Sequence, residues 1–440
     1  MARQMKDSGI EWIGEIPETW DTIKFKYLFS ITGGNGFPEN LQGQTEGTYP
    51  FCKVSDINGH SDYVDTAANY VSDEVAKAHG FNIIPCGSII IAKIGAALQK
   101  NHRKINSVPC IIDNNTQALV PIRADNLRYL LYLTRCIDMG WFDNNSTVPS
   151  LNNNKLLNFF VPNVSVAEQQ RIAAFLDRKC AEIDAVIERT KATIEEYKKL
   201  KQAVITEAVT KGVRGPRPMK DSGIEWIGEI PEEWRLAKMH HVCATITDYV
   251  ASGSFASLAE NVLYLDEPDY AMLVRTMDVS GKGYSGKPVY INQHAYEFLS
   301  NSNLFGGEIM MPNIGASVGD VYIVPKLYER MSLAPNSIML RTNINDKFVY
   351  YYFMSNSGRR SVLDIAESTA QPKFNKTDFR QLRIPLPCDI EQDEIVDYLD
   401  EKCAALDTLI AKKTALLTEL ETYKKSLIYE YVTGKKEVTA

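Results

Sequence analysis

Two stretches of the chain, residues 168–210 and 391–433, carry mostly apolar residues at alternating steps of four and three. This is the heptad spacing of a helix that packs lengthwise against another helix. Each stretch is therefore predicted to form one long helix, roughly 65 Å from end to end at 1.5 Å per residue. The apolar seam positions are Leu176, Cys180, Ile183, Ile187 and Ile194 in the first stretch and Leu399, Cys403, Leu406, Ile410 and Leu417 in the second.

The two stretches are copies of one another. Residues 168–187 read EQQRIAAFLDRKCAEIDAVI and residues 391–410 read EQDEIVDYLDEKCAALDTLI, with ten of twenty positions identical at a constant offset of 223. Polar residues interrupt both seams at matched places, Thr190 with Lys413 and Lys201 with Lys424. Equal lengths and matched interruptions favour pairing of the two helices with each other as an antiparallel coiled coil. Two amphipathic helices in separate bundles are the alternative.

A second repeat lies earlier in each copy. Residues 5–20 read MKDSGIEWIGEIPETW and residues 219–234 read MKDSGIEWIGEIPEEW, identical at fifteen of sixteen positions. Glycine and proline exclude one continuous helix here, and Trp12, Ile13 and Trp20 are expected to hold this arm against the domain that follows. The chain therefore runs arm, domain, long helix, linker, arm, domain, long helix. Expected bounds are 1–165 and 219–388 for arm and domain, 166–211 and 389–434 for the helices, 212–218 for the linker and 435–440 for a tail.

The two domains differ far more from each other than the arms and helices do, but some landmarks persist. Residues 87–99 (GSIIIAKIGAALQ) correspond to residues 307–319 (GEIMMPNIGASVG), each an apolar strand followed by a turn with glycine. Short β-rich runs dominate both domains, with helical patches near residues 127–136 and 348–355. The sequence thus predicts an α+β chain: two homologous α/β domains and two long helices in a pseudo-two-fold repeat.

Composition narrows the class of protein. The 440 residues have a net charge of −7, which by itself argues weakly against nucleic acid because an electrostatic footprint is local. No stretch approaches 18 uncharged apolar residues, so no membrane span is expected. The eight cysteines form no C-x-x-C pair and the six histidines form no H-x-x-x-H pair, so neither a disulfide framework nor a metal site is expected. A reducing cytoplasm fits this cysteine usage.

Two segments resemble catalytic motifs but lack essential parts. Residues 281–288 (GKGYSGKP) place Pro288 where a phosphate-binding loop needs a hydroxyl, and a strand-like run follows instead of a helix. Residues 32–38 (TGGNGFP) form a glycine turn that no helix can follow directly, and the chain has no N-P-P-[YF] run of a methyltransferase. We therefore expect no catalytic residue and no cofactor site in this chain.

Polar loops in both domains have the side chains that duplex DNA requires. Lysine and arginine bind phosphates, whereas arginine, asparagine and glutamine also read base edges. Candidates in the first domain are Lys93, Gln99, Lys100, Asn101, His102, Arg103, Lys104, Asn144, Asn145, Ser146, Thr147, Asn152 and Asn153. Candidates in the second domain are Arg275, Lys282, Lys287, Asn313, Ser317, Arg359, Arg360, Gln371, Lys373, Asn375 and Lys376. A solvated polar surface is the alternative for any single residue.

The repeat strengthens the DNA interpretation. Two homologous domains on two antiparallel helices have approximate two-fold symmetry, which matches the pseudo-two-fold axis of duplex DNA. Each domain would bind one half-site, and rigid helices would fix the distance between half-sites. Different loops would then read different half-sites, giving an asymmetric, split target.

The doubled arm MKDSGIEWIGEIPE-x-W and the doubled helix EQ-x-x-I-x-x-x-LD-x-K-x-x-x-x-D resemble the specificity subunit of type I restriction–modification systems, over the whole chain and in the family's order. The resemblance implies two target-recognition domains that read a bipartite DNA sequence through the major groove, a spacer set by the helices, and no catalytic activity. It also implies docking of two adenine methyltransferase subunits and of restriction subunits with translocase and nuclease activity. S-adenosylmethionine, ATP and Mg would bind those partners. The recognition domains vary within the family, so no base contact carries over.

Two other classes of function stay open at this stage. A DNA-modifying enzyme with an unrecognised catalytic site would bind S-adenosylmethionine as the isolated chain. A purely structural coiled-coil adaptor would show no sequence-specific DNA binding even with its partners, and would leave the divergence of the two domains unexplained.

Overall fold

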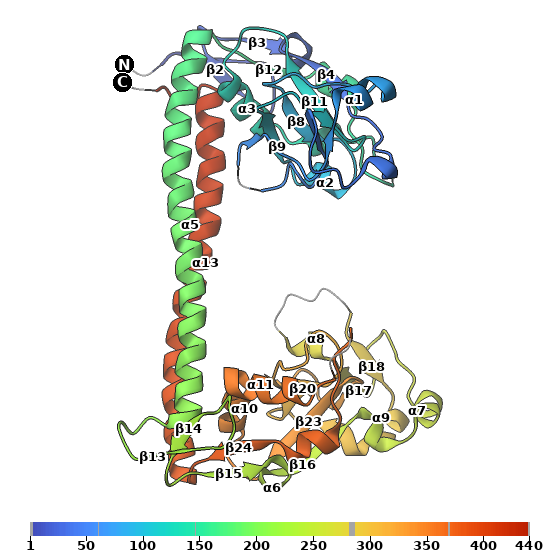
Figure 1. Ribbon diagram of the computed structural model, residues 1–440, viewed down its shortest axis with the longest axis vertical. Helices are drawn as coiled ribbons and strands as arrows, with labels where there is room; N and C mark the ends of the chain where they lie inside the picture. The colour runs from blue at the N-terminus through green and yellow to red at the C-terminus, as the bar shows by residue number, and fades with distance from the viewer. Residues whose placement is uncertain (1–2, 60, 146, 281–286, 368–369, 439–440) are drawn as a thin grey trace. The chain divides into compact units, whose positions relative to one another are not determined.

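The computed structural model describes residues 3–59, 61–145, 147–280, 287–367 and 370–438. The chain divides into two compact units: unit 1 comprises residues 1–190 and 415–440, and unit 2 comprises residues 191–414. Two long helices, α5 (Val166–Lys211) and α13 (Asp389–Val432), belong partly to each unit (Figure 1). The fold predicted from the sequence, an α+β chain with a doubled domain and two long helices, is confirmed.

Charged pairs fix the register of the two helices within each unit. In unit 1, Lys424 Nζ lies 2.6 Å from Asp184 Oδ2, and in unit 2, Lys201 Nζ lies 2.6 Å from Asp407 Oδ2. Both acids and both lysines are related by the sequence offset of 223, so the two pairs are equivalent. In both, an acid in the first half of one helix meets a lysine in the second half of the other, which makes the pairing antiparallel. Lys201 and Lys424, two of the residues that interrupt the heptad seams, are therefore paired with acids of the opposite helix.

The predicted seam lies between the helices over most of its length. Eight of its ten positions are buried, and Ile410 and Leu417 on α13 are half-buried. In unit 1, Leu176, Cys180 and Ile183 join one core with Leu427 and Val432 of α13. Burial also raises the pKa of the Cys180 thiol. In both units, residues from distant parts of the sequence thus complete a single core.

Unit 1 builds its domain around a five-stranded sheet in the order β4-β11-β8-β9-β6, with a three-stranded sheet β10-β5-β7 beside it. Its hairpin β1-β2 and the pair β12-β3 complete the strands. The helix α3 (Leu127–Arg135) lies between the sheet and α5 and is almost entirely buried. The strands are β1 Met5–Asp7, β2 Glu15–Pro17, β3 Asp21–Lys24, β4 Phe29–Gly33, β5 Tyr49–Cys52, β6 Tyr63–Val64, β7 Tyr70–Val71, β8 Ile89–Ala92, β9 Arg103–Asn106, β10 Ile111–Ile112, β11 Thr116–Pro121 and β12 Phe160–Asn163. The other helical elements are η1 Phe25–Tyr27, η2 Glu39–Leu41, α1 Asp73–His79, α2 Ala96–Gln99, η3 Met139–Phe142 and α4 Asn153–Leu157.

Unit 2 has a similar plan but divides its strands into two four-stranded sheets. Its sheets are β16-β23-β20-β21 and β18-β17-β22-β19, with a hairpin β13-β14 and a pair β15-β24. The strands are β13 Met219–Asp221, β14 Glu229–Pro231, β15 Arg235–Lys238, β16 Cys243–Asp248, β17 Ala271–Val274, β18 Val289–Ile291, β19 Asn303–Leu304, β20 Ile309–Pro312, β21 Tyr322–Ile323, β22 Met331–Leu333, β23 Ser337–Thr342 and β24 Arg383–Leu386. The other helical elements are α6 Met239–Val242, η4 Tyr249–Ser252, α7 Phe255–Asn261, α8 Thr276–Val279, α9 Gln293–Phe298, η5 Ser300–Ser302, α10 Asp346–Met354, α11 Asn356–Asp364 and α12 Lys376–Gln381.

The arms fold as matched hairpins that are clamped to the helices. Met5 pairs with Pro17 in unit 1 and Met219 with Pro231 in unit 2. The indole of Trp20 donates to the Glu168 carboxylate at 2.8 Å. In unit 2, the indole of Trp234 donates to Glu391 at 2.9 Å. Both acids begin the repeated helix motif, so the arm clamp joins the two repeats that the sequence shows separately.

A second acid on each helix anchors the domain. Asp177 accepts from Arg128 at 2.5 Å and from Tyr132 at 2.8 Å, both on α3. At the equivalent place, Asp400 accepts from Lys347 and Tyr351 of α10. Among the residues described, no helix is long and apolar enough to cross a membrane.

Candidate nucleic-acid interface

One turn with the same backbone appears in both units, although the side chains around it differ. In unit 1 it consists of Lys93, Ile94 and Gly95, directly after β8. Gly95 has a φ of 69°, and its N–H donates to the Pro149 carbonyl at 2.7 Å. Ile94 also forms a β-bridge with Ser150. The positive φ favours glycine because it has no Cβ.

In unit 2 the turn consists of Asn313, Ile314 and Gly315, directly after β20. Gly315 has a φ of 98°, and its N–H donates to the Pro372 carbonyl at 2.9 Å. Ile314 forms a β-bridge with Lys373. We call these places the turn sites: residues 93–95, 113–115 and 148–153 in unit 1, and residues 313–315, 335–337 and 371–376 in unit 2.

A third segment completes each turn site and was missed by the sequence analysis. Lys93 N–H donates to the Asn115 carbonyl at 2.9 Å, and Asn313 N–H donates to the Asn336 carbonyl at 3.1 Å. Asn336 has a φ of 66°, a conformation that asparagine adopts more readily than most residues. The signal available in the sequence was an asparagine turn just before β11 and β23, the strands that pair with β8 and β20.

An amide cluster borders the turn site of unit 1, as the sequence suggested. Asn152 donates to the Asn144 side-chain oxygen at 2.9 Å, and its own oxygen caps α4 by accepting from Lys155 N–H at 3.1 Å. Asn153 accepts from Gln117 at 3.0 Å. Asn145 and Thr147 are exposed on the same loop, and Ser146 lies outside the described residues.

The loop after α2 holds the other predicted residues of unit 1. Gln99 and Lys100 are exposed. Asn101 adopts a φ of 55°; its amide donates to Asp138 at 2.7 Å and accepts from Met139 N–H at 2.9 Å. This asparagine therefore organises the loop. Burial, followed by the charges of Lys100, Arg103 and Lys104, lowers the pKa of His102.

Arg103 does not occupy a position from which it could contact DNA, which corrects the sequence-based expectation for this residue. Its side chain is buried at 5% exposure on β9, and its guanidinium donates to the carbonyl oxygens of Asn101 and Ile137. Burial lowers its pKa to about 10. Lys104 is also buried, but its ammonium has no ion-pair partner among the described residues.

In unit 2, several predicted residues gather at the turn site. Asn313 has a buried side-chain oxygen without a partner among the described residues. Lys373 lies 3.4 Å from Glu367, and Lys376 lies 2.7 Å from Asp248. Asn375 caps α12 by accepting from Asp378 N–H at 2.9 Å. Gln371 belongs to the last of the three segments, and Ser317 follows the first by two residues. Five of the eleven predicted residues of unit 2 therefore lie in the turn site.

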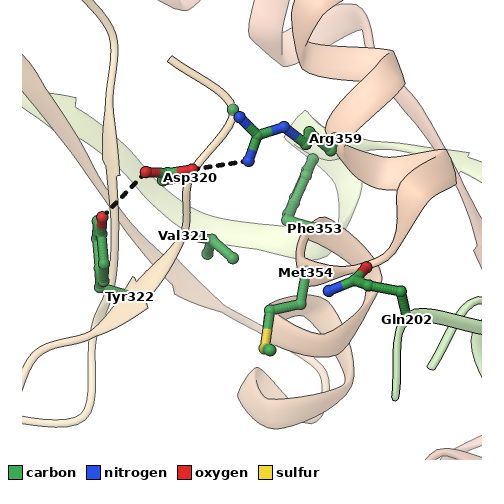
Figure 2. Close-up of a pocket in the computed structure, with 8 residues that line it drawn as sticks. Gln202, Asp320, Val321, Tyr322, Phe353, Met354 and Arg359 are labelled. Atoms are coloured by element: carbon green, nitrogen blue, oxygen red, sulfur yellow. Dashed lines mark hydrogen bonds and ion pairs between the residues drawn. The ribbon is translucent and has the colours of Figure 1, made fainter. Parts of the chain in front are cut away.

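The remaining candidates of unit 2 are not part of its turn site. Arg275 caps α8 through Asp278 at 2.8 Å. Arg359 lies 2.7 Å from Asp320 at the side of a pocket of about 220 Å³ (Figure 2). Gln202 and Met354 also line this pocket, which contains no pair of groups suited to nucleophilic catalysis. Lys287 and Arg360 are exposed, and Lys282 lies outside the described residues.

No group of three or more His, Cys, Asp or Glu side chains in the described part of the chain is arranged to hold a metal ion. Hydrogen-bond donors, acceptors and ammonium groups on fixed loops dominate both turn sites. Such an arrangement suits recognition of a polar, anionic surface, because amides read base edges and ammonium groups bind phosphates.

Comparisons with known proteins agree on a family. Residues 17–196 and 263–421, more than half of the chain, match the model of the type I restriction modification DNA specificity domain. The chain is 25% identical to the type I restriction enzyme MjaVIII specificity subunit of Methanocaldococcus jannaschii, covering 96% of this chain and 94% of that one. It is 26% identical to the putative MjaX specificity subunit of the same organism, covering 97% and 96%.

A solved structure shows the same fold. A chain from work on complex assembly and conformational transition of the type I R-M system matches with a TM-score of 0.69 and 16% identity, over 96% of this chain and 99% of that chain. The family model matches both halves of the sequence, including both turn sites and most of both long helices. The chain belongs to the family of type I restriction modification DNA specificity domains.

Proposed function

We propose that this chain is the sequence-specific DNA-binding subunit of a type I restriction–modification complex. Each unit reads one half of a bipartite, asymmetric target through the major groove, and the chain itself performs no catalysis. The observation that carries the proposal is the pair of turn sites, which share one backbone arrangement but present different side chains. One scaffold with two sets of base-reading groups supports recognition of two different half-sites.

We choose the proposed DNA-contacting residues from the sequence candidates by whether their side chains are accessible to solvent. In unit 1 this set comprises Lys93, Gln99, Lys100 and the asparagine cluster. Arg103 and Lys104 are removed because both side chains are buried on β9, and the Arg103 guanidinium donates to carbonyl oxygens. In unit 2 it is centred on Asn313, Lys373 and Lys376. Because both long helices belong to both units, helix length would set the run of unspecified bases between the half-sites.

Methylation mapping tests this function. We expect co-expression with an adenine methyltransferase subunit to produce methylated adenines in a single split motif, two short blocks around a fixed run of unspecified bases. Exchanging Asn313, Lys373 and Lys376 for alanine should change or erase one block only. Active methyltransferase with no motif at all would contradict the proposal and favour a structural adaptor.

The proposal also includes a surface on the long helices where partner subunits would bind. Exposed apolar residues occupy the helix position just before the seam, where coiled coils usually carry charged residues. Val186 and Tyr423 do so in unit 1, with 46% and 54% of their surface exposed. Leu200 and Leu409 do so in unit 2, with 49% and 41% exposed.

These four residues form two equivalent patches. Val186 matches Leu409 and Leu200 matches Tyr423 at the offset of 223. In an antiparallel pair of helices, positions just before the seam lie on one side of the pair. The Asp184–Lys424 pair sets Val186 and Tyr423 at the same height along the helices, and the Lys201–Asp407 pair does so for Leu200 and Leu409. Two matched patches suit two copies of one helical partner, which we propose to be the methyltransferase subunit. Restriction subunits would join that core, and S-adenosylmethionine, ATP and Mg would bind the partners.

Charge substitution tests the docking patches. Changing Val186 and Tyr423 to glutamate should remove one methyltransferase copy from the purified complex, because a buried carboxylate in an apolar contact is costly. Changing Leu200 and Leu409 as well should remove both copies. Light scattering measures the mass of each complex. Ala192→Glu and Ala415→Glu are the controls, since these exposed residues also match at the offset of 223 and point away from the seam. Equal losses in the controls would contradict the assignment.

A further inference from the structure

One exposed aromatic residue of unit 2, Phe255, lies on the segment that follows the sheet edge of the turn site. Asp248, the last residue of β16, pairs with Ile338, and Pro312, the last residue of β20, pairs with Ser337. The end of β16 and the turn after β20 therefore lie at the same edge of the sheet. Lys376 of the turn site also binds Asp248 at 2.7 Å. The segment that follows β16, η4 and α7, starts from this edge.

The apolar face of helix α7 is buried in the hydrophobic core over part of its length and exposed at its first residue. Phe255, Leu258 and Val262 are spaced by three and four residues, which puts them on one helix face. Leu258 and Val262 are buried, with 3% and 7% of their surface exposed, against Tyr249, Ala295 and Leu299. Phe255 is 78% exposed, the largest fraction of any large apolar side chain that the structure describes.

The other end of the same helix is firmly held, so the exposure of Phe255 does not come from a loosely packed element. Asn261 donates to the Ser257 carbonyl at 2.8 Å, and its side-chain oxygen lies 2.9 Å from a ring nitrogen of His294. Ser254 caps the helix by accepting from Ser257 N–H at 3.3 Å. The aromatic ring is thus presented from a fixed support.

The surroundings of Phe255 tolerate a polyanion. Residues 249–259 (YVASGSFASLA) contain no acidic and no basic residue, in a chain of net charge −7. In the sequence, small residues, several with hydroxyl groups, flank Phe255 on both sides. An exposed apolar ring among small neutral residues is the composition of the wedges that proteins insert between stacked bases.

We propose that Phe255 inserts between two stacked base pairs at or next to the half-site read by unit 2. This inference rests on the DNA-binding function proposed above and adds a contact of another kind, stacking instead of hydrogen bonding. The inserted ring would open one base step and favour target sequences whose steps unstack easily, because deformation energy depends on sequence. Part of the specificity of this half-site would then come from a step that no polar side chain reads.

Fluorescence of 2-aminopurine measures base unstacking. The complete complex of this chain with its methyltransferase subunits is bound to target duplexes that carry one 2-aminopurine at each successive position of the half-site and its flanks. In the wild type we expect one base step, separate from the methylated adenine, to increase in fluorescence. Phe255→Ala should return this step to the level of the free duplex and weaken target binding about ten-fold, a size typical of one lost stacking contact. Phe255→Trp should restore the affinity.

Phe305→Ala is the matched control. Phe305 is 60% exposed and precedes β20, so it lies at the opposite edge of the same sheet. Its removal should change neither fluorescence nor affinity. Signals at the methylated adenine should persist in every variant, because base flipping there belongs to the methyltransferase.

Three outcomes would overturn the proposal. Unchanged unstacking and affinity in Phe255→Ala would remove the wedge while leaving the proposed function intact. Loss of methyltransferase subunits from the Phe255→Ala complex would assign the ring to a protein contact. A wild-type complex without target-specific binding would overturn the wedge together with the proposed function.

Discussion

Replacing Glu391 with alanine is expected to lower the unfolding free energy of unit 2 by about 3–5 kcal/mol, as for other buried ion pairs that lose one partner. The Glu391 side chain is only 1% exposed; its carboxylate lies 2.6 Å from Arg217 and accepts from the indole of Trp234 at 2.9 Å. Its loss leaves the buried indole N–H without an acceptor and removes the buried one of the two carboxylates that pair with the Arg217 guanidinium. Calorimetry should show the midpoint of the affected transition falling by roughly 10 °C.

Two matched variants separate this effect from a general loss of charge. Glu233→Ala removes the other acid at Arg217, 2.8 Å away, but its side chain is 55% exposed, so the midpoint should stay nearly constant. Glu168→Ala removes the equivalent clamp of unit 1, where the carboxylate is 16% exposed, and should give a smaller decrease than Glu391→Ala. A Glu391→Ala protein as stable as the wild type would contradict the role of the clamp.

Replacing Lys93 and Lys100 with alanine is expected to weaken binding of the complex to DNA about 60-fold at 0.1 M salt, if each lysine neutralises one phosphate. Neither has an ion-pair partner among the described residues, and neither is buried, so both ammonium groups are accessible. The slope of log K against log salt should become shallower by about 1.8, because each contact contributes about 0.9. Binding titrations across a series of salt concentrations measure both quantities.

Lys26→Ala is the control for the lysine variant. Lys26 is exposed and precedes β4, whose first residue pairs with Pro121, so it lies at the sheet edge opposite the turn site. Its slope should equal that of the wild type. Arg103→Ala should lower stability and leave the slope unchanged, because its guanidinium is held by backbone carbonyl oxygens. An unchanged slope in the lysine variant would exclude this loop from the interface.

Elements with strong local patterns could be predicted from the sequence. The two long helices follow from their heptad spacing, and their pairing follows from matched interruptions of the seam. The arms follow from a nearly identical repeat that contains glycine and proline. The turns at Gly95 and Gly315 also left a local signal, since an apolar strand is followed each time, three residues later, by a glycine. Each of these features depends on residues close together in the sequence.

The sequence could not predict in this way which candidate side chains are accessible to DNA. Arg103 and Lys100 stand in one basic run, yet one side chain is buried and the other exposed, because β9 buries all four of its residues from Arg103 onward whereas Lys100 lies in the loop before it. The exposure of Phe255 likewise contradicts its place on the apolar face of α7 and appears only where the core ends. Asn115 and Asn336 join the turn sites through strand pairing, which brings together segments that are far apart in the sequence.

The sequence by itself thus determined the doubled architecture, the two long helices, and the resemblance that indicates DNA specificity. Only the tertiary structure decided which polar side chains are free, because availability depends on partners that come from distant residues. It also decided that the seam lysines Lys201 and Lys424 pair with acids of the opposite helix. Finally, it showed that the end of α13 completes the core of unit 1, since burying an apolar helix face requires contacts that no local pattern can specify.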